Sequence, residues 1–145
     1  TNNFGRGVAG AAPDATIMPV KVFTDEGDIF ELLPGGFDNY MADGIRFAAD
    51  NGAHVINLSI GPLPPESYVQ EFNAATEEAI DYAQSLGVVI VAAAGNFNQP
   101  ICEYPSGSDG VICVGATDRD GEPTSYLVAA DCLHSPIRRR LRRCR

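Results

Sequence analysis

Asn96 is the residue of this sequence that is best placed to do chemistry. It follows a run of β-branched and small residues, Val88 to Gly95, which is typical of a fully buried strand. Such a strand delivers one polar side chain to the edge of a sheet, where a carboxamide can donate a hydrogen bond to a developing oxyanion. The alternative is an ordinary turn asparagine after a core strand.

Ser59-Ile60-Gly61 is a second candidate site, because it lies where another apolar run opens into a proline-rich loop. A glycine at this point lets another backbone approach, as when an extended peptide adds to a sheet edge. In a parallel α/β sheet, ligands bind at the carboxyl ends of the strands. We therefore expect Asn96 and the segment ending at Gly61 to lie at the same ligand-binding edge of the sheet.

Other kinds of site fit the sequence poorly. Of the two histidines, His54 opens a strand and His134 lies in the anomalous C-terminal segment, and no G-x-S-x-G elbow is present. The residues alone therefore contain no credible Ser-His-Asp triad. Residues 5–10 match G-x-G-x-x-G, but only four residues precede them and Pro13 follows closely, so nucleotide binding is not expected.

Composition narrows the class of protein. The 145 residues are 45% hydrophobic, as in one soluble globular domain. Without the C-terminal arginines, four basic residues face 19 carboxylates, which argues against a nucleic-acid partner. We find no apolar stretch that could span a membrane and no signal-peptide pattern at the start. The arginines set aside here are Arg138, Arg139, Arg140, Arg142, Arg143 and Arg145.

The four cysteines leave two readings open. Cys102 and Cys113 flank a short loop, so they form a disulfide if the protein is secreted, or they are two free buried thiols. No C-x-x-C pair occurs, and zinc is therefore not expected.

Hydrophobic periodicity predicts strands over residues 15–23, 54–60, 88–96 and 110–117. It also predicts a helix capped by Asp38 and ended by Gly52, and a second helix that starts at Ser67 and ends at Gly87. Val69, Phe72, Ala75, Ala79, Ala83 and Leu86 form the expected buried face of the second helix. Strands alternating with helices predict an α/β fold, with a mainly parallel sheet and helices on both faces.

The periodic patterns stop after Tyr126. We expect residues 1–126 to form the domain and residues 127–145 to be an aberrant or disordered basic tail. A reading-frame or assembly error in the gene explains this tail, and the alternative is a natural basic tail on an acidic domain.

Seven segments, in this order, resemble the subtilisin-like serine proteases, the subtilases, from about Thr1 to Tyr126. They are Gly10 to Ala15, Val20-Lys21-Val22, Gly44-Ile45, Val55 to Gly61, Gly87 to Asn96, Tyr104-Pro105 and Val114 to Thr117. The resemblance implies a partial three-layer domain that lacks some strands, among them the one carrying the catalytic Asp. We therefore expect the isolated polypeptide to be unstable or prone to aggregation.

The resemblance also implies roles for individual residues. Asn96 is the oxyanion-hole amide, and Ser59-Ile60-Gly61 resembles the strand that pairs with the substrate backbone. Ala93-Ala94-Gly95 looks like one wall of the pocket for the residue before the cleaved bond. The family's calcium loop would fall at residues 2–8, where Phe4 and Arg6 depart from its oxygen ligands, so we expect no metal and no cofactor.

The family carries its catalytic triad in the motifs G-T-S-M-A-x-P, H-G-T-H-x-x-G and D-x-G. The first two do not occur here. The strings Asp25-Glu26-Gly27 and Asp50-Asn51-Gly52 match D-x-G, but the resemblance places the strand that carries the catalytic Asp outside these residues. The resemblance thus implies a fragment of an endopeptidase that cleaves peptide or protein substrates, and a fragment that is inactive by itself. The alternative is a non-catalytic α/β module that binds an extended peptide. Subtilases are often secreted, so the parent is compatible with secretion, while localisation and oligomeric state stay open.

Overall fold

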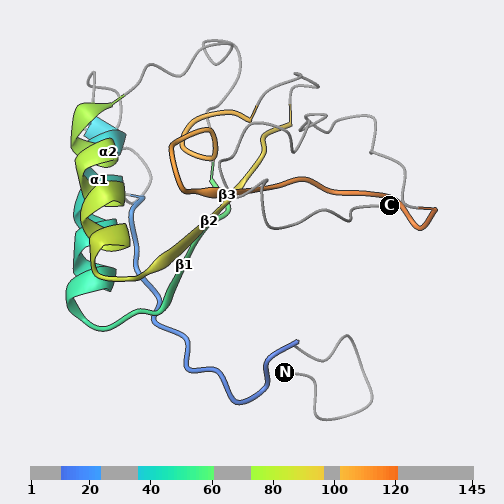
Figure 1. The fold of residues 1–145 in the computed structure, drawn as a ribbon, viewed down its shortest axis with the longest axis horizontal. Coiled ribbons are helices and arrows are strands. Elements are labelled where there is room, and N and C mark those ends of the chain that lie inside the picture. Colours follow the sequence, from blue (N-terminus) through green and yellow to red (C-terminus); the bar gives the residue numbers. More distant parts are fainter. Residues whose placement is uncertain (1–10, 24–35, 61–72, 97–101, 121–145) are drawn as a thin grey trace.

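The protein is described by a computed structural model over residues 11–23, 36–60, 73–96 and 102–120. Along the chain it contains α1 (Gly36–Asp50), β1 (Val55–Leu58), α2 (Ala74–Ser85), β2 (Val89–Ala93) and β3 (Ile112–Val114). Figure 1 shows α1 and α2 side by side, with the three strands beside them. Neither helix is long and apolar enough to cross a membrane.

The three strands form one parallel sheet in the order β1-β2-β3. Leu58 pairs with Ala92, and Ala93 pairs with Val114, so all three strands end at the same edge. The predicted α/β class with a parallel sheet is thereby confirmed. Both helices pack on one face of this sheet (Figure 1), and a helix on the other face is not found within the described ranges.

The core lies between the two helices and the face of the sheet that they cover. Small residues on α2 let the two helices approach closely. Every second residue of β1 and β2 fills the space between the helices and the sheet. Its centre is formed by Met41 and Ile45 of α1, Ala79, Ile80 and Ala83 of α2, Ile56 and Leu58 of β1, and Ile90 and Ala92 of β2.

Both helices end at the predicted glycines. Gly52 and Gly87 have φ values of 81° and 83°, a left-handed conformation that glycine adopts without steric cost. The N–H of Ala53 donates to the carbonyl of Ala48 (3.0 Å), and the N–H of Val88 donates to that of Ala83 (3.1 Å). The same C-terminal motif therefore turns each helix directly into the following strand.

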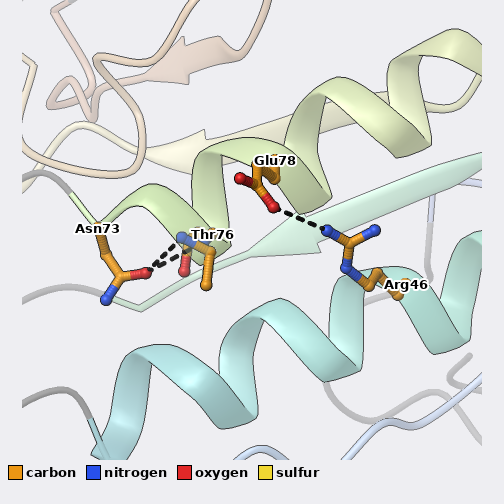
Figure 2. Close-up of polar contacts among 5 residues, drawn as sticks. Arg46, Asn73, Thr76 and Glu78 are labelled. Atoms are coloured by element: carbon orange, nitrogen blue, oxygen red, sulfur yellow. Dashed lines mark hydrogen bonds and ion pairs between the residues drawn. The ribbon is translucent and has the colours of Figure 1, made fainter.

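The starts of both helices differ from our predictions. α2 begins at Ala74, because the Asn73 side chain accepts hydrogen bonds from the N–H groups of Ala75 and Thr76 (2.9 and 3.1 Å; Figure 2). A helix running from Ser67 through Asn73 is therefore wrong, and Ser67 itself lies outside the described residues. α1 begins at Gly36, so Asp38 lies inside the helix and is not its N-cap.

Two predicted features of α2 have opposite outcomes. Ala79 and Ala83 are buried as expected, and Ala75 is half-buried against the core. Leu86 is 54% exposed, which contradicts its predicted burial. The reason is its position at the C-cap, where the chain already turns away from the helical period.

The predicted strand over residues 15–23 is not formed. The described residues 11–23 are mostly exposed and pair with no strand. Val20 and Val22 nevertheless lie against α1 at Gly44, where a Cβ atom would come within 2.6 Å of the Val22 side chain. An extended segment needs a neighbouring strand to pair its backbone, and among the described residues no strand lies beside this one.

β2 is not fully buried, contrary to the prediction. Ile90 and Ala92 point into the core, whereas Val89 and Ala93 are exposed. The helices cover only one face of the strand, and β-branched side chains on its other face remain in contact with water. β3 is also shorter than the expected residues 110–117.

Polar contacts join the outer sides of the helices. Arg46 of α1 lies 3.7 Å from Glu78 of α2 (Figure 2) and 5.5 Å from the ring centre of Tyr82. The Tyr82 hydroxyl donates to Asp50 (2.6 Å). This hydrogen bond is the main cause that raises the pKa of Tyr82 above 10.0. Exposed contacts of this kind add little stability individually.

Candidate functional site

The carboxyl ends of β1 and β2 form the edge at which the candidate residues lie. After β1, Ser59 is exposed and Ile60 is half-buried against the core. The Asn57 side chain donates to the Ser59 hydroxyl (2.9 Å). By the strand register, Ser59 and Ile60 lie beside the last residues of β2. Gly61 falls outside the described residues.

The end of β2 is held by two backbone hydrogen bonds of Ala94. The N–H of Ala94 donates to the carbonyl of Val114 (2.9 Å), and its carbonyl accepts from the N–H of Glu103 (3.0 Å). Gly95 then turns the chain with a φ of 107°. Asn96 follows in a bend and is exposed, so its carboxamide lies outside the core at this edge.

The three small residues before Asn96 differ in their surroundings. Ala93 is exposed, Ala94 is buried and Gly95 is half-buried. Alternation along an extended chain explains this pattern, because successive side chains point to opposite sides. Together they leave the end of β2 without bulky side chains.

A short loop packs against this end of β2. It is tied to β3 by a disulfide between Cys102 and Cys113, with a Cα–Cα distance of 6.4 Å, which decides between the two readings of these cysteines. The Glu103 carbonyl accepts from the N–H of Gly107 and from the hydroxyl of Ser106 (3.0 and 2.5 Å). These contacts hold the loop in a fixed turn beside Gly95.

His54 lies at the opposite end of the sheet from Asn96. Its carbonyl accepts from the N–H of Val89, the first residue of β2, and its side chain is exposed. The five residues of β2 separate the two ends by roughly 15 Å, at about 3.3 Å per residue. His54 therefore cannot act as a base beside Asn96, in agreement with the sequence analysis.

In the described part of the chain, no three or more His, Cys, Asp or Glu residues gather as metal ligands would. The segment over residues 2–8, where the calcium loop would fall, lies outside that part. The chemistry that this edge can support is hydrogen bonding by Asn96 and by the backbone at the ends of β1 and β2.

A family model for subtilases, the subtilisin-like serine proteases, matches residues 1–138 of the chain. The chain belongs to the subtilase family. The resemblance inferred from the seven segments is thereby confirmed. The match continues beyond Tyr126, and the proposed boundary between residues 126 and 127 remains a prediction, because both residues lie outside the described part.

Individual relatives agree with this subtilase assignment. Thermitase of Thermoactinomyces vulgaris is 36% identical over 126 residues, which are 87% of this chain and 40% of thermitase. Subtilisin BL of Lederbergia lenta is 36% identical over 120 residues, 83% of this chain and 39% of that protein. This subtilase chain therefore spans about two fifths of the length of each of these two relatives.

Solved structures show the same fold. The patellamide maturation protease PatA matches with a TM-score of 0.54 and 34% identity, over 61% of this chain and 32% of that one. Sphericase matches with a TM-score of 0.51 and 31% identity, over 61% and 30%. The architecture of this subtilase chain is thus a partial subtilisin-like α/β domain.

Sequence reasoning missed one residue of this subtilase chain that lies beside the candidate site, Glu103. Its carboxylate occupies the space that a Cβ atom on Gly95 would need. The sequence places Glu103 beside Tyr104-Pro105, one of the segments that carry the resemblance, but its contact with Gly95 is made only in the folded chain. A glycine near the end of a strand was the available signal, because it marks a close approach by another group.

Proposed function

We propose that this chain supplies the oxyanion-binding and substrate-holding part of a subtilisin-like serine endopeptidase. The observation that carries the proposal is the exposed carboxamide of Asn96, at the edge where β1 and β2 both end. A group that stabilises a transient anion must be reachable by substrate and held by a rigid frame. Asn96 is exposed, and Ala94, two residues before it, is fixed by hydrogen bonds to Val114 of β3 and to Glu103.

In this proposal the substrate backbone pairs with Ser59-Ile60-Gly61 as an added strand. The side chain before the cleaved bond lies against Ala93-Ala94-Gly95. When the carbonyl carbon is attacked, its oxygen gains negative charge, and the Asn96 carboxamide donates a hydrogen bond to it. Removal of such a donor from a subtilisin costs about 2.7–4 kcal/mol of transition-state stabilisation.

The 145 residues alone should not turn over substrate, because the family motifs that carry the nucleophile and the base do not occur among them. In a subtilisin, loss of these groups lowers kcat roughly a millionfold. The test is incubation of the purified chain with a chromogenic peptide. Cleavage that a serine-directed inhibitor stops would refute this part of the proposal.

The role of Asn96 is tested in the gene's own context. Reading the flanking sequence in all frames should reveal H-G-T-H upstream and G-T-S-M-A downstream, whereas intact and unrelated flanks favour the peptide-binding alternative. In a polypeptide that contains all three motifs, Asn96→Ala should lower kcat about 10²–10³-fold with little change in KM.

The matched control is Asn51→Ala. Asn51 is also an exposed carboxamide, but it donates to the Phe47 carbonyl at the end of α1, far from the carboxyl ends of the strands. We expect this variant to keep its kcat. Equal losses in both variants would show that Asn96 acts through stability and not through the oxyanion.

A further inference from the structure

Glu103 places a negative charge against the wall formed by Ala93-Ala94-Gly95. Its carboxylate fills the space beside the Gly95 backbone where any side chain would stand. The oxygen Oε1 of this carboxylate is buried. Gly95 is thus constrained twice, by its φ of 107° and by the acid beside it.

Hydrogen bonds at both its N–H and its carbonyl hold the backbone of Glu103 in place. Its N–H donates to the Ala94 carbonyl (3.0 Å), and its carbonyl accepts from Gly107 and Ser106. The preceding residue, Cys102, is bonded to Cys113 of β3. A carboxylate on such a frame is held in place before a ligand arrives, so little ordering is required on binding.

A carboxylate on this wall changes which side chain can lie there. An apolar side chain packed beside it would bring neither an opposite charge nor a hydrogen-bond donor to the carboxylate. A guanidinium or ammonium group brings both an opposite charge and N–H donors. The acidic character of the chain, with a net charge of −9, attracts the same kind of substrate from a distance.

We propose that Glu103 makes this site select a cationic side chain, arginine or lysine, in the residue immediately before the cleaved bond. The inference rests on the function proposed above, in which Ala93-Ala94-Gly95 contacts that side chain. It adds a substrate class that small wall residues alone would not specify, since alanine and glycine carry no charge.

The test is a binding titration of the full 145-residue chain labelled with ¹⁵N. One peptide is succinyl-Ala-Ala-Pro-Arg-amide, and its partner carries citrulline, the uncharged isostere of arginine, at the last position. Backbone amide shifts of Gly95 and Asn96 report binding at the end of β2. We expect the arginine peptide to bind about tenfold more tightly than the citrulline peptide.

Two variants assign this difference to one carboxylate. Glu103→Gln keeps the shape of the side chain and should bring both peptides to the affinity of the citrulline peptide. Glu78→Gln removes the same charge from the outer side of α2, where Glu78 faces Arg46, and should leave the tenfold difference intact. If Glu103→Gln loses its dispersed amide spectrum, the comparison of the two peptides on the unaltered chain decides.

The possible outcomes separate this inference from the function on which it rests. Equal affinity of both peptides, with shifts at Gly95 and Asn96, overturns the cationic preference and leaves the peptide-holding role standing. Absence of shifts at these residues with either peptide overturns the peptide-holding role as well. A tenfold difference that survives in Glu103→Gln assigns the preference to another group and overturns the role of Glu103.

Discussion

The two faces of the sheet are built from similar residues but have different surroundings. On the face under the helices, Ile56, Leu58 and Ile90 are at most 8% exposed. On the opposite face, Val55 is 59% and Val89 is 44% exposed, and Ile112 and Val114 of β3 are similarly accessible. Apolar residues on both sides are typical of parallel strands that pack on both faces.

This difference shows that residue type did not decide which side of the sheet became the core. Only one face meets helices within the described residues, while the chain spans about two fifths of the length of thermitase and of subtilisin BL. An apolar sheet face that stays in contact with water favours self-association. If the isolated chain aggregates, as we expect, we predict that it does so through the exposed apolar surface formed by Val55, Val89, Ile112 and Val114.

The largest expected effect on stability distinguishes the two faces of the sheet through two adjacent residues of β2. Ile90→Ala removes a side chain that is 1% exposed and should lower the free energy of unfolding by about 2–5 kcal/mol. Val89→Ala acts on the exposed face and should cost less than about 1 kcal/mol. Urea denaturation of both variants measures the difference. Equal losses would mean that the second face is covered as well as the first.

The disulfide should matter most for the strand with the least burial. Cys102→Ser with Cys113→Ser opens a loop closed over a sequence separation of 11 and should cost about 3 kcal/mol. Hydrogen exchange should accelerate at the Ala94 amide, which bonds to β3, more than at the Val89 amide, which bonds next to β1. Uniform acceleration would contradict a local role for the disulfide at β3.

On the helix-covered side, the cap of α2 is a smaller contribution. Asn73→Ala removes the acceptor for the N–H groups of Ala75 and Thr76 and should cost about 1 kcal/mol. Asn73→Asp retains a capping oxygen and should restore most of this stability. Thermal unfolding followed by circular dichroism measures both variants. A helix start at Ser67 would instead make Asn73→Ala nearly neutral.

The smallest effect concerns the outer contact between Tyr82 and Asp50. Because the hydrogen bond to Asp50 raises the pKa of Tyr82 above 10.0, its stabilising effect is complete below that pH. The effect is lost as the pH rises through the higher pKa of the folded state. Tyr82→Phe should therefore be less stable than the unaltered chain below pH 10, and this difference should disappear once the pH exceeds the raised pKa of the folded state. A constant difference at all pH values would exclude the phenol as the cause.

Local signals predicted the elements whose ends depend on a single residue. Gly52 and Gly87 stop the helices because only a left-handed residue closes those turns, and that requirement is visible in the sequence. The first residue of α2 was harder to predict from the sequence, because Ser67 and Asn73 are both good N-caps. Local preference alone does not rank two competing caps when packing selects between them.

Features that depend on distant partners were not predictable. The segment over residues 15–23 has the composition of a strand, but within the described part of the chain no strand pairs with it. The contact between Glu103 and Gly95 joins residues from two separate segments that only the fold brings together. The Cys102–Cys113 bond likewise required the loop to return to β3.

The sequence by itself determined the family, the parallel α/β pattern, the helix C-termini and the placement of Asn96 after a strand. The family follows from the resemblance of seven ordered segments to the subtilases. The other three follow from short-range order along the chain, where glycine conformation and hydrophobic period act within a few residues. The tertiary structure alone decided which sheet face is buried, where α2 begins and which acid lies beside Gly95. Those outcomes depend on contacts between segments, whose free energies no local pattern contains.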